Sequence, residues 1–181
     1  MGKVKTELLA FCVVMLLVIW QGVAWAEPLT VSWAELRTNR PETCVVFLDT
    51  YENYSTCSPQ TASARLFSKK YDACTPGTKN LDGQTVRIAG YAHPLEFEFR
   101  DVKSFLLIPP LRQDCRHPPP PLPDQVIAVE FSKGMNVTAD PVWVTGVLRL
   151  VRSKTHIVTT AYTLEATAVV PATIPDVVVN D

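Results

Sequence analysis

Short runs in which apolar and polar side chains alternate fill the second half of the chain. Their ranges are 85–92, 95–99, 103–109, 125–131, 142–150 and 161–170. Alternation with a period of two predicts β-strands, and in the second run it predicts that Leu95, Phe97 and Phe99 point inward. Gly90 lies within the first run, where a glycine indicates a bulge or bend that lets a sheet curl. We therefore expect a mainly β fold, as a small closed or partly open barrel, with a two-sheet sandwich as the alternative.

The first 26 residues have the layout of a secretory signal peptide. Lys3 and Lys5 precede the apolar run 8–20, and the small-residue site Ala24-Trp25-Ala26 follows it. We expect cleavage near Ala26, export of the mature chain and no membrane span after cleavage, because no later segment is long and apolar enough. The alternative is an uncleaved N-terminal anchor.

The remaining residues divide into three parts. We expect an N-terminal segment with a helix, a strand and a Cys-containing, loop-rich stretch at 27–80, a β-barrel domain at 81–170, and a flexible tail at 171–181. Within the first part, Ser32 and Glu35 form a capping-box pattern that predicts a short helix. The apolar run 44–49 predicts a buried strand. The polar stretch that follows, from 50 to 80, is expected to hold a short helix near 61–71.

Four cysteines remain once Cys12 leaves with the signal peptide: Cys44, Cys57, Cys74 and Cys115. An even count in an oxidising compartment favours disulfides, and four cysteines allow three pairings. Cys44, Cys57 and Cys74 lie in one region of the sequence. If two of these pair with each other, the third either joins Cys115 or stays free.

Charge and motifs exclude several classes of function. Without the signal peptide the chain carries 15 basic and 17 acidic side chains, a net charge of −2, so the basic face of a nucleic-acid binder is not expected. The sequence has no G-x-S-x-G elbow, no HExxH helix and no phosphate-binding glycine loop. We therefore expect a protein that is not an enzyme.

Four blocks in the second half carry a resemblance to a known family. They are LDGQTVRIAGYAHPLEF, FLLIPPLRQDCRHPPPPLPDQVIAVEF, DPVWVTGVLRL and AYTLEA, and they occur in that order between about residues 81 and 169. This arrangement resembles a bacterial exported family named domain of unknown function 3299. The resemblance implies an OB-like β-barrel in the periplasm. It also implies partners among envelope transporters or metal-homeostasis proteins, which points to metal handling.

The loop between the third and fourth runs contains a candidate metal site. Cys115 and His117 are two residues apart, so both side chains point the same way on an extended chain. Thiolate and imidazole are the usual ligands of zinc, which we expect before copper. His93 and His156, each at a strand end, are the candidate further ligands, with Asp114 or Asp124 as acidic help. Arg112 and Arg116 favour the thiolate form of Cys115 by charge.

The proline run after this pair supports a second hypothesis. Pro118, Pro119, Pro120 and Pro121 favour polyproline II, because each fixes its backbone and lacks a donor N–H. The run is either a rigid strap that orients Cys115 and His117, or a docking surface for a membrane transporter. In the docking hypothesis Cys115 belongs to a structural disulfide and no metal binds. A thiol redox protein is a third possibility.

Overall fold

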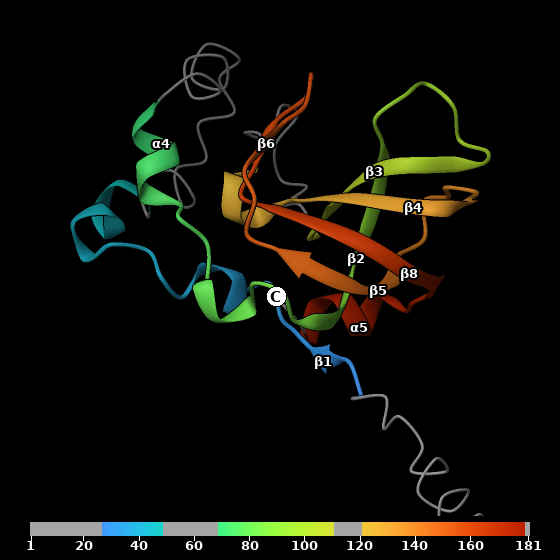
Figure 1. Ribbon diagram of the computed structural model, residues 1–181, viewed down its shortest axis with the longest axis horizontal. Coiled ribbons are helices and arrows are strands. Elements are labelled where there is room, and N and C mark those ends of the chain that lie inside the picture. Colours follow the sequence, from blue (N-terminus) through green and yellow to red (C-terminus); the bar gives the residue numbers. More distant parts are fainter. Residues whose placement is uncertain (1–26, 49–68, 111–120, 180–181) are drawn as a thin grey trace, which may run out of the picture.

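A barrel of five long strands forms the centre of the computed structural model, which describes residues 27–48, 69–110 and 121–179 (Figure 1). The strands are β2 (Thr85–Pro94), β3 (Val102–Ile108), β4 (Ile127–Met135), β5 (Val142–Arg149) and β8 (Tyr162–Pro171). The shorter elements are β1 (Leu29–Thr30), η1 (Glu35–Arg37), η2 (Glu42–Cys44), α4 (Lys69–Cys74), η3 (Lys79–Leu81), η4 (Pro123–Gln125), β6 (Ser153–Lys154), β7 (Thr159–Thr160) and α5 (Ile174–Val179).

Strand pairing closes the barrel completely. The order is β2–β3–β4–β8–β5, and β5 pairs again with β2. Neighbouring strands are antiparallel except β4 and β8, which run parallel. A small five-stranded barrel, in which the first long strand pairs with one neighbour along its first part and with another along its second, is the architecture of OB-like folds. The prediction of a mainly β, OB-like barrel is therefore confirmed. The closed form is the one observed, and the two-sheet sandwich is not.

Gly90 is the point at which β2 changes partner. Residues 85–90 pair with β5, whereas residues 91–94 pair with β3. A Cβ at Gly90 would lie 2.7 Å from the carbonyl oxygen of Ile108 and 2.9 Å from the ring of Trp33. Only a residue without a side chain fits this approach of two backbones. The sequence singled out Gly90 correctly, and its role is to allow this close approach where β2 changes partner.

The barrel interior is filled by the inward-facing residues of the five strands. Alternate positions point inside, as the sequence pattern predicts. The fully buried members include Val86, Ile88, Phe105, Leu107, Ile127, Val129, Val144, Leu148, Tyr162 and Leu164.

The N-terminal segment belongs to this core. Glu35 Oε2 accepts hydrogen bonds from the backbone N–H and the hydroxyl of Ser32, both at 2.7 Å, and the Glu35 N–H donates back to Ser32 Oγ at 3.2 Å. The predicted capping box is thus formed, and the helix it begins is the single turn η1. It brings Trp33 and Leu36 into the barrel core, where Trp33 Nε1 donates to the Ala89 carbonyl at 2.8 Å.

The predicted buried strand at 44–49 is wrong. Residues 42–44 form η2 and residues 45–48 are α-helical. Helical spacing explains the burial, because Cys44 and Leu48 are four residues apart and both point into a small apolar cluster. Val45 and Val46 between them are 47% and 79% exposed. A short apolar run can be helix or strand, and packing decides here.

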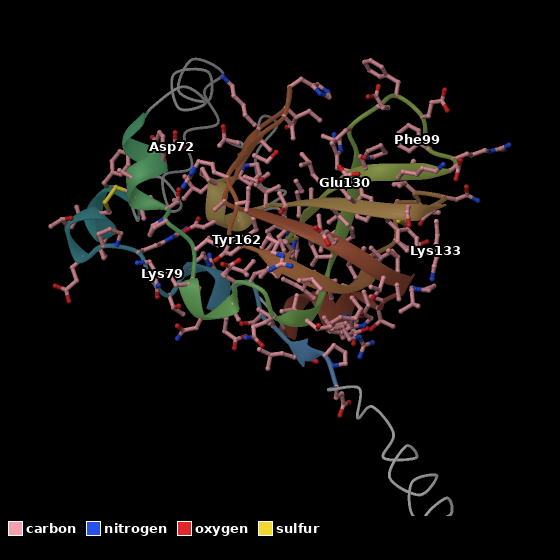
Figure 2. The ribbon with its side chains drawn as sticks, in the orientation of Figure 1. Asp72, Lys79, Phe99, Glu130, Lys133 and Tyr162 are labelled. Atoms are coloured by element: carbon pink, nitrogen blue, oxygen red, sulfur yellow. A yellow bond between two sulfur atoms is a disulfide. The ribbon has the colours of Figure 1, made fainter. Side chains whose placement is uncertain are left out.

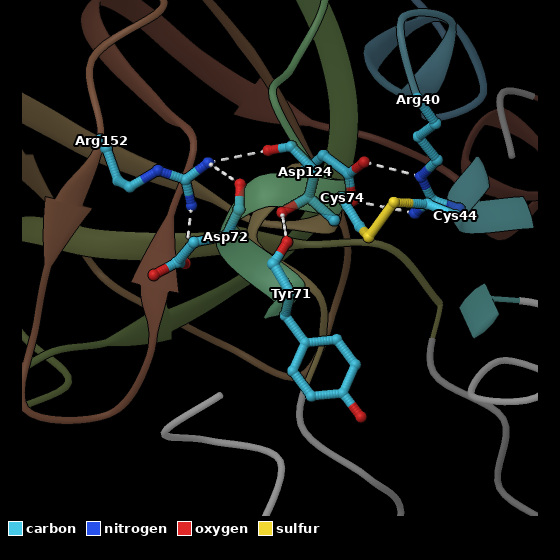
Figure 3. Close-up of a disulfide and its surroundings, with 8 residues drawn as sticks. Arg40, Cys44, Tyr71, Asp72, Cys74, Asp124 and Arg152 are labelled. Atoms are coloured by element: carbon cyan, nitrogen blue, oxygen red, sulfur yellow. Dashed lines mark hydrogen bonds and ion pairs between the residues drawn. A yellow bond between two sulfur atoms is a disulfide. The ribbon is translucent and has the colours of Figure 1, made fainter. Parts of the chain in front are cut away.

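A disulfide joins this helical turn to α4. Cys44 and Cys74 are bonded, with their Cα atoms 5.6 Å apart, as Figure 3 shows. Around the bond the rings of Phe47 and Tyr71 stack with centroids 4.8 Å apart, and Leu122 completes the cluster. Helix α4 overlaps the short helix predicted near 61–71 only at residues 69–71, and the rest of that prediction lies outside the described part of the chain.

The predicted strand at 95–99 is also wrong. β2 ends at Pro94, and the chain then forms a loop up to β3. Only Leu95 turns toward the barrel, whereas Phe97 is fully exposed and Phe99 is 60% exposed. The Leu95 N–H still donates to the Ser104 carbonyl of β3 at 3.4 Å, whereas the Phe99 carbonyl accepts a hydrogen bond from the Val137 N–H at 2.9 Å, which bonds the loop to the β4–β5 connection.

The C-terminal segment is not a frayed tail within the described residues. Thr173 donates from its N–H and its hydroxyl to Asp176 Oδ2, at 2.7 and 2.8 Å, which lowers the pKa of Asp176. Helix α5 follows and buries Val177 completely against Ala89 and Trp143. The prediction of a flexible tail at 171–181 did not foresee this helix, because the partners of Val177 lie on strands that are distant in the sequence.

In the described ranges, no helix has the length and apolar character needed to cross a bilayer.

Candidate functional site

The outer face of β3 and β4 carries an apolar cluster outside the barrel interior. Leu106 pairs with Ala128 across the two strands, and both point away from the interior. Val126 lies beside them, and Ile108 packs against the cluster. In OB-like folds the corresponding strands, together with the neighbouring loops, form the ligand-binding side. We call these four residues the outer β3–β4 face.

Two loops cover this face. The β6–β7 hairpin contributes Val158, which is buried, and Ile157, which is partly buried. The loop between β2 and β3 contributes Leu95 from the other side. The hairpin is held by Thr155, whose hydroxyl donates to the Val158 carbonyl at 2.8 Å. The outer β3–β4 face is therefore enclosed by segments about sixty residues apart in the sequence.

His93 lies beside the outer β3–β4 face, and His156 is next in sequence to a residue that packs on it. His93 pairs with Leu106 in the β2–β3 register, so it lies in the same outward row as Leu106. His156 precedes Ile157, which packs on the cluster. Both histidines are exposed. The expectation that strand ends bring the two histidines to one side of the barrel stays a prediction.

The other two predicted ligands, Cys115 and His117, lie outside the described residues, as do Pro118, Pro119 and Pro120. Both ends of their loop are described. It leaves from β3, whose last residue, Ile108, packs on the outer β3–β4 face. It returns through Pro121, which is half-buried, to Leu122, which is 2% exposed.

The returning end of the proline loop is firmly anchored. The Leu122 N–H donates to Gln125 Oε1 at 2.9 Å, and the Gln125 N–H donates to the Leu122 carbonyl at 2.8 Å. The Pro123 carbonyl accepts from the Ala161 N–H at 2.7 Å, which attaches η4 to the start of β8.

Asp124 is a structural residue, and its proposed role as acidic help for a metal is wrong. Its side chain is fully buried and accepts two hydrogen bonds from the Arg40 guanidinium, at 2.7 and 2.8 Å. Figure 3 shows this pair beside the disulfide. Such a two-point ion pair occupies both carboxylate oxygens, so Asp124 is not available as a ligand. Asp114 lies outside the described residues.

The Cys44–Cys74 disulfide limits the possible partners of Cys115. Cys44, Cys57 and Cys74 were the disulfide candidates, and two of them, Cys44 and Cys74, are bonded to each other. The cysteines left in the predicted mature chain are Cys57 and Cys115, which are both outside the described residues. Cys115 is therefore either free, with Cys57 free as well, or joined to Cys57 or to another molecule.

Tyr162 is a buried polar residue that sequence reasoning missed (Figure 2). Its hydroxyl donates to the Leu36 carbonyl at 2.8 Å and accepts from the Thr78 N–H. Burial is the main cause that raises the pKa of Tyr162 above its ordinary value of 10.0, against the lowering effect of the Thr78 hydrogen bond. The sequence contained one signal for this residue: a tyrosine stands where the alternation of β8 requires an inward-facing side chain, and a buried tyrosine hydroxyl usually has a hydrogen-bond partner.

The described residues hold no complete metal centre. Within 27–48, 69–110 and 121–179, no three His, Cys, Asp or Glu side chains form a group that could hold an ion. His93 and His156 offer imidazole nitrogens, which suit zinc, but a zinc site takes three or four ligands. A site at this face therefore needs the side chains of the 111–120 loop.

The fold and this face define an OB-like barrel protein with a disulfide-linked N-terminal segment. A family model described as "Protein of unknown function (DUF3299)" matches residues 33–171, and the chain belongs to that family. The resemblance noted in the sequence is thereby confirmed.

One solved structure supports the fold. The crystal structure of a DUF3299 family protein (PA4066) from Pseudomonas aeruginosa PAO1 is similar, with a TM-score of 0.55 and 24% sequence identity. The similarity covers 81% of this chain and 97% of that one. No curated protein matches the chain. The similarity concerns architecture and assigns no chemistry.

Proposed function

We propose that this chain is an exported, periplasmic, non-enzymatic protein that binds a transition metal, zinc before copper, at the outer β3–β4 face. Cys115 and His117 are the primary ligands, and His93 and His156 complete the set. The protein serves an envelope transport or metal-homeostasis system.

One observation carries the proposal. His93 lies in the same outward row as Leu106, and His156 directly precedes Ile157, which packs on the same apolar cluster. The loop that contains Cys115 and His117 leaves β3 beside that cluster. The anchored end at Leu122–Gln125 gives this loop a fixed base, and preorganised ligands need such support. The disulfide supports export, because stable disulfides are typical of oxidising compartments.

The test is metal analysis of the purified mature chain together with a count of free thiols. We expect about one zinc per chain, with loss of the metal in Cys115→Ser and in His117→Ala. His93→Ala or His156→Ala should weaken binding. Cys57→Ser is the matched control, because it removes the other remaining cysteine and should leave the metal content unchanged. Full zinc occupancy in Cys115→Ser would contradict the site.

The second candidate is an interaction module that docks a membrane transporter through Pro118–Pro121. The Cys44–Cys74 bond favours it, because the remaining pair, Cys57 and Cys115, is then the natural second disulfide in an oxidising compartment. A mature chain with no free thiol and no metal supports this candidate. Replacing Pro119 and Pro120 with alanine should then abolish transporter binding without unfolding the barrel.

A further inference from the structure

Two phenylalanines project from the loop between β2 and β3 into solvent. Phe97 is fully exposed and Phe99 is 60% exposed. They are not displaced core residues, because Phe105 and Phe131 fill the barrel interior. Figure 2 shows Phe99 on the loop that rises from the ends of β2 and β3. Exposed aromatic side chains that lie close together are typical of interaction sites.

The loop that carries them is held at its base. The Phe99 carbonyl accepts from the Val137 N–H at 2.9 Å, and the Asp101 N–H donates to Asn136 Oδ1 at 3.4 Å. Gly134 fits against Asp101 so closely that a Cβ there would lie 2.1 Å from Asp101 Oδ1. A loop that is already ordered loses little entropy on binding, so its aromatic side chains are well placed to contact a partner.

Acidic groups alternate with the aromatic ones. Glu96 and Glu98 are exposed on either side of Phe97, and within the described residues neither has a hydrogen-bond or ion-pair partner. Arg100 follows, and Asp101 pairs with Lys103 at 3.7 Å. The tip is therefore apolar with an excess of negative charge. With Glu96 and Glu98 against Arg100, residues 95–100 carry a net charge of −1, which favours a basic protein surface over anionic lipid or nucleic acid.

We propose that residues 95–100 form a docking loop for a protein partner that offers an apolar pocket bordered by lysine or arginine. Phe97 and Phe99 enter the pocket, and Glu96 and Glu98 face its basic border. This inference is independent of the proposed metal site, since it uses none of the proposed ligands.

The test begins with the full chain in the cells that produce it. A photoreactive phenylalanine analogue at position 97 should yield one defined crosslinked protein, identified by mass spectrometry. Binding is then measured with that purified protein. We expect the pair Phe97→Ser and Phe99→Ser to weaken binding about tenfold or more. The pair Glu96→Lys and Glu98→Lys should weaken it similarly, with less loss at high salt.

Matched controls are Val170→Ser and Glu165→Lys, which change exposed residues on β8 and should leave binding unchanged. Several outcomes would overturn the proposal. They are the absence of a crosslinked protein, a crosslinked second copy of this chain, binding that is insensitive to charge reversal, and phenylalanine-dependent binding to vesicles of phosphatidylethanolamine and phosphatidylglycerol. Circular dichroism of each variant verifies that the barrel is folded.

Discussion

Single buried polar residues connect parts of this fold that are distant in the sequence. The Tyr162 hydroxyl joins β8 to the Leu36 carbonyl and the Thr78 N–H. Replacing Tyr162 with phenylalanine leaves both of these groups without this partner. We expect a loss of about 1–3 kcal/mol in the free energy of unfolding, measured by urea denaturation of the mature chain. Tyr91→Phe is the matched control, because the Tyr91 hydroxyl makes no hydrogen bond within the described residues.

The same residue predicts a dependence on alkaline pH. The folded-state pKa of Tyr162 is raised above 10.0, so the unfolded chain loses this proton first. The stabilisation is fully present below pH 10 and is lost as the pH rises through the folded-state pKa. Tyr162→Phe should therefore flatten the decline of stability above pH 10. An identical decline in the variant would contradict the assignment.

At the scale of elements, the helix α5 covers one side of the barrel. Val177 is fully buried against Ala89 and Trp143. An aspartate at position 177 would place a charge in this contact and release the helix. We expect Val177→Asp to shift the fluorescence of Trp143 to longer wavelength, while Trp33, which is 1% exposed, remains buried.

The control for α5 lies on the same helix. Ile174 is 64% exposed, so Ile174→Asp introduces the same charge without burying it. It should leave the fluorescence of Trp143 unchanged. Equal shifts in the two variants would mean that α5 is released by charge alone and that the buried contact of Val177 is not what holds it.

Elements with strict alternation and sheet partners were predictable from the sequence, whereas two apolar runs were not. The strands β2, β3, β4, β5 and β8 follow the predicted runs because each has a neighbour on both sides. The run 95–99 has the same alternation, yet its backbone bonds to Val137, and a pattern within one segment cannot show that. The run 44–49 contains a helical turn over residues 45–48, and the cluster on which Cys44 and Leu48 pack includes Tyr71, Cys74 and Leu122, which are distant in the sequence.

The candidate site was predictable only in part, because contacts between segments distant in the sequence decide it as well. Histidines at strand ends were visible in the sequence. The fold places His93 in the outward row of Leu106, and it places Ile157, the residue after His156, on the same cluster. The sequence did not show that Asp124 is bound by Arg40 and so is not available as a ligand, because Arg40 lies 84 residues before it. An even count of cysteines predicted disulfides, but the pairing depends on distances that only the folded chain supplies.

At the scale of the whole molecule, the described residues form four apolar clusters, of which the barrel core is the largest. The barrel core includes the five strands and the N-terminal turn around Trp33, whereas the disulfide lies in a separate cluster with Leu48, Tyr71 and Leu122. Polar contacts join the two parts: the Arg40–Asp124 pair, and Arg152, which donates to Asp72 at 2.9 Å (Figure 3). We therefore expect the small cluster to depend on the disulfide more strongly than the barrel does.

This division predicts how the protein responds to loss of the bond. In the chain-entropy description, a disulfide that closes a loop of about thirty residues contributes about 3.5 kcal/mol. We expect a variant with both Cys44→Ser and Cys74→Ser to show faster hydrogen exchange at the amides of residues 69–75. Exchange at the interior strands should stay unchanged, because opening is local when the cores are separate. The variant with Cys57→Ser and Cys115→Ser is the matched control and should leave residues 69–75 protected. Faster exchange throughout β2 to β8 in the first variant would mean that the disulfide stabilises the barrel itself, and that the two cores unfold as one.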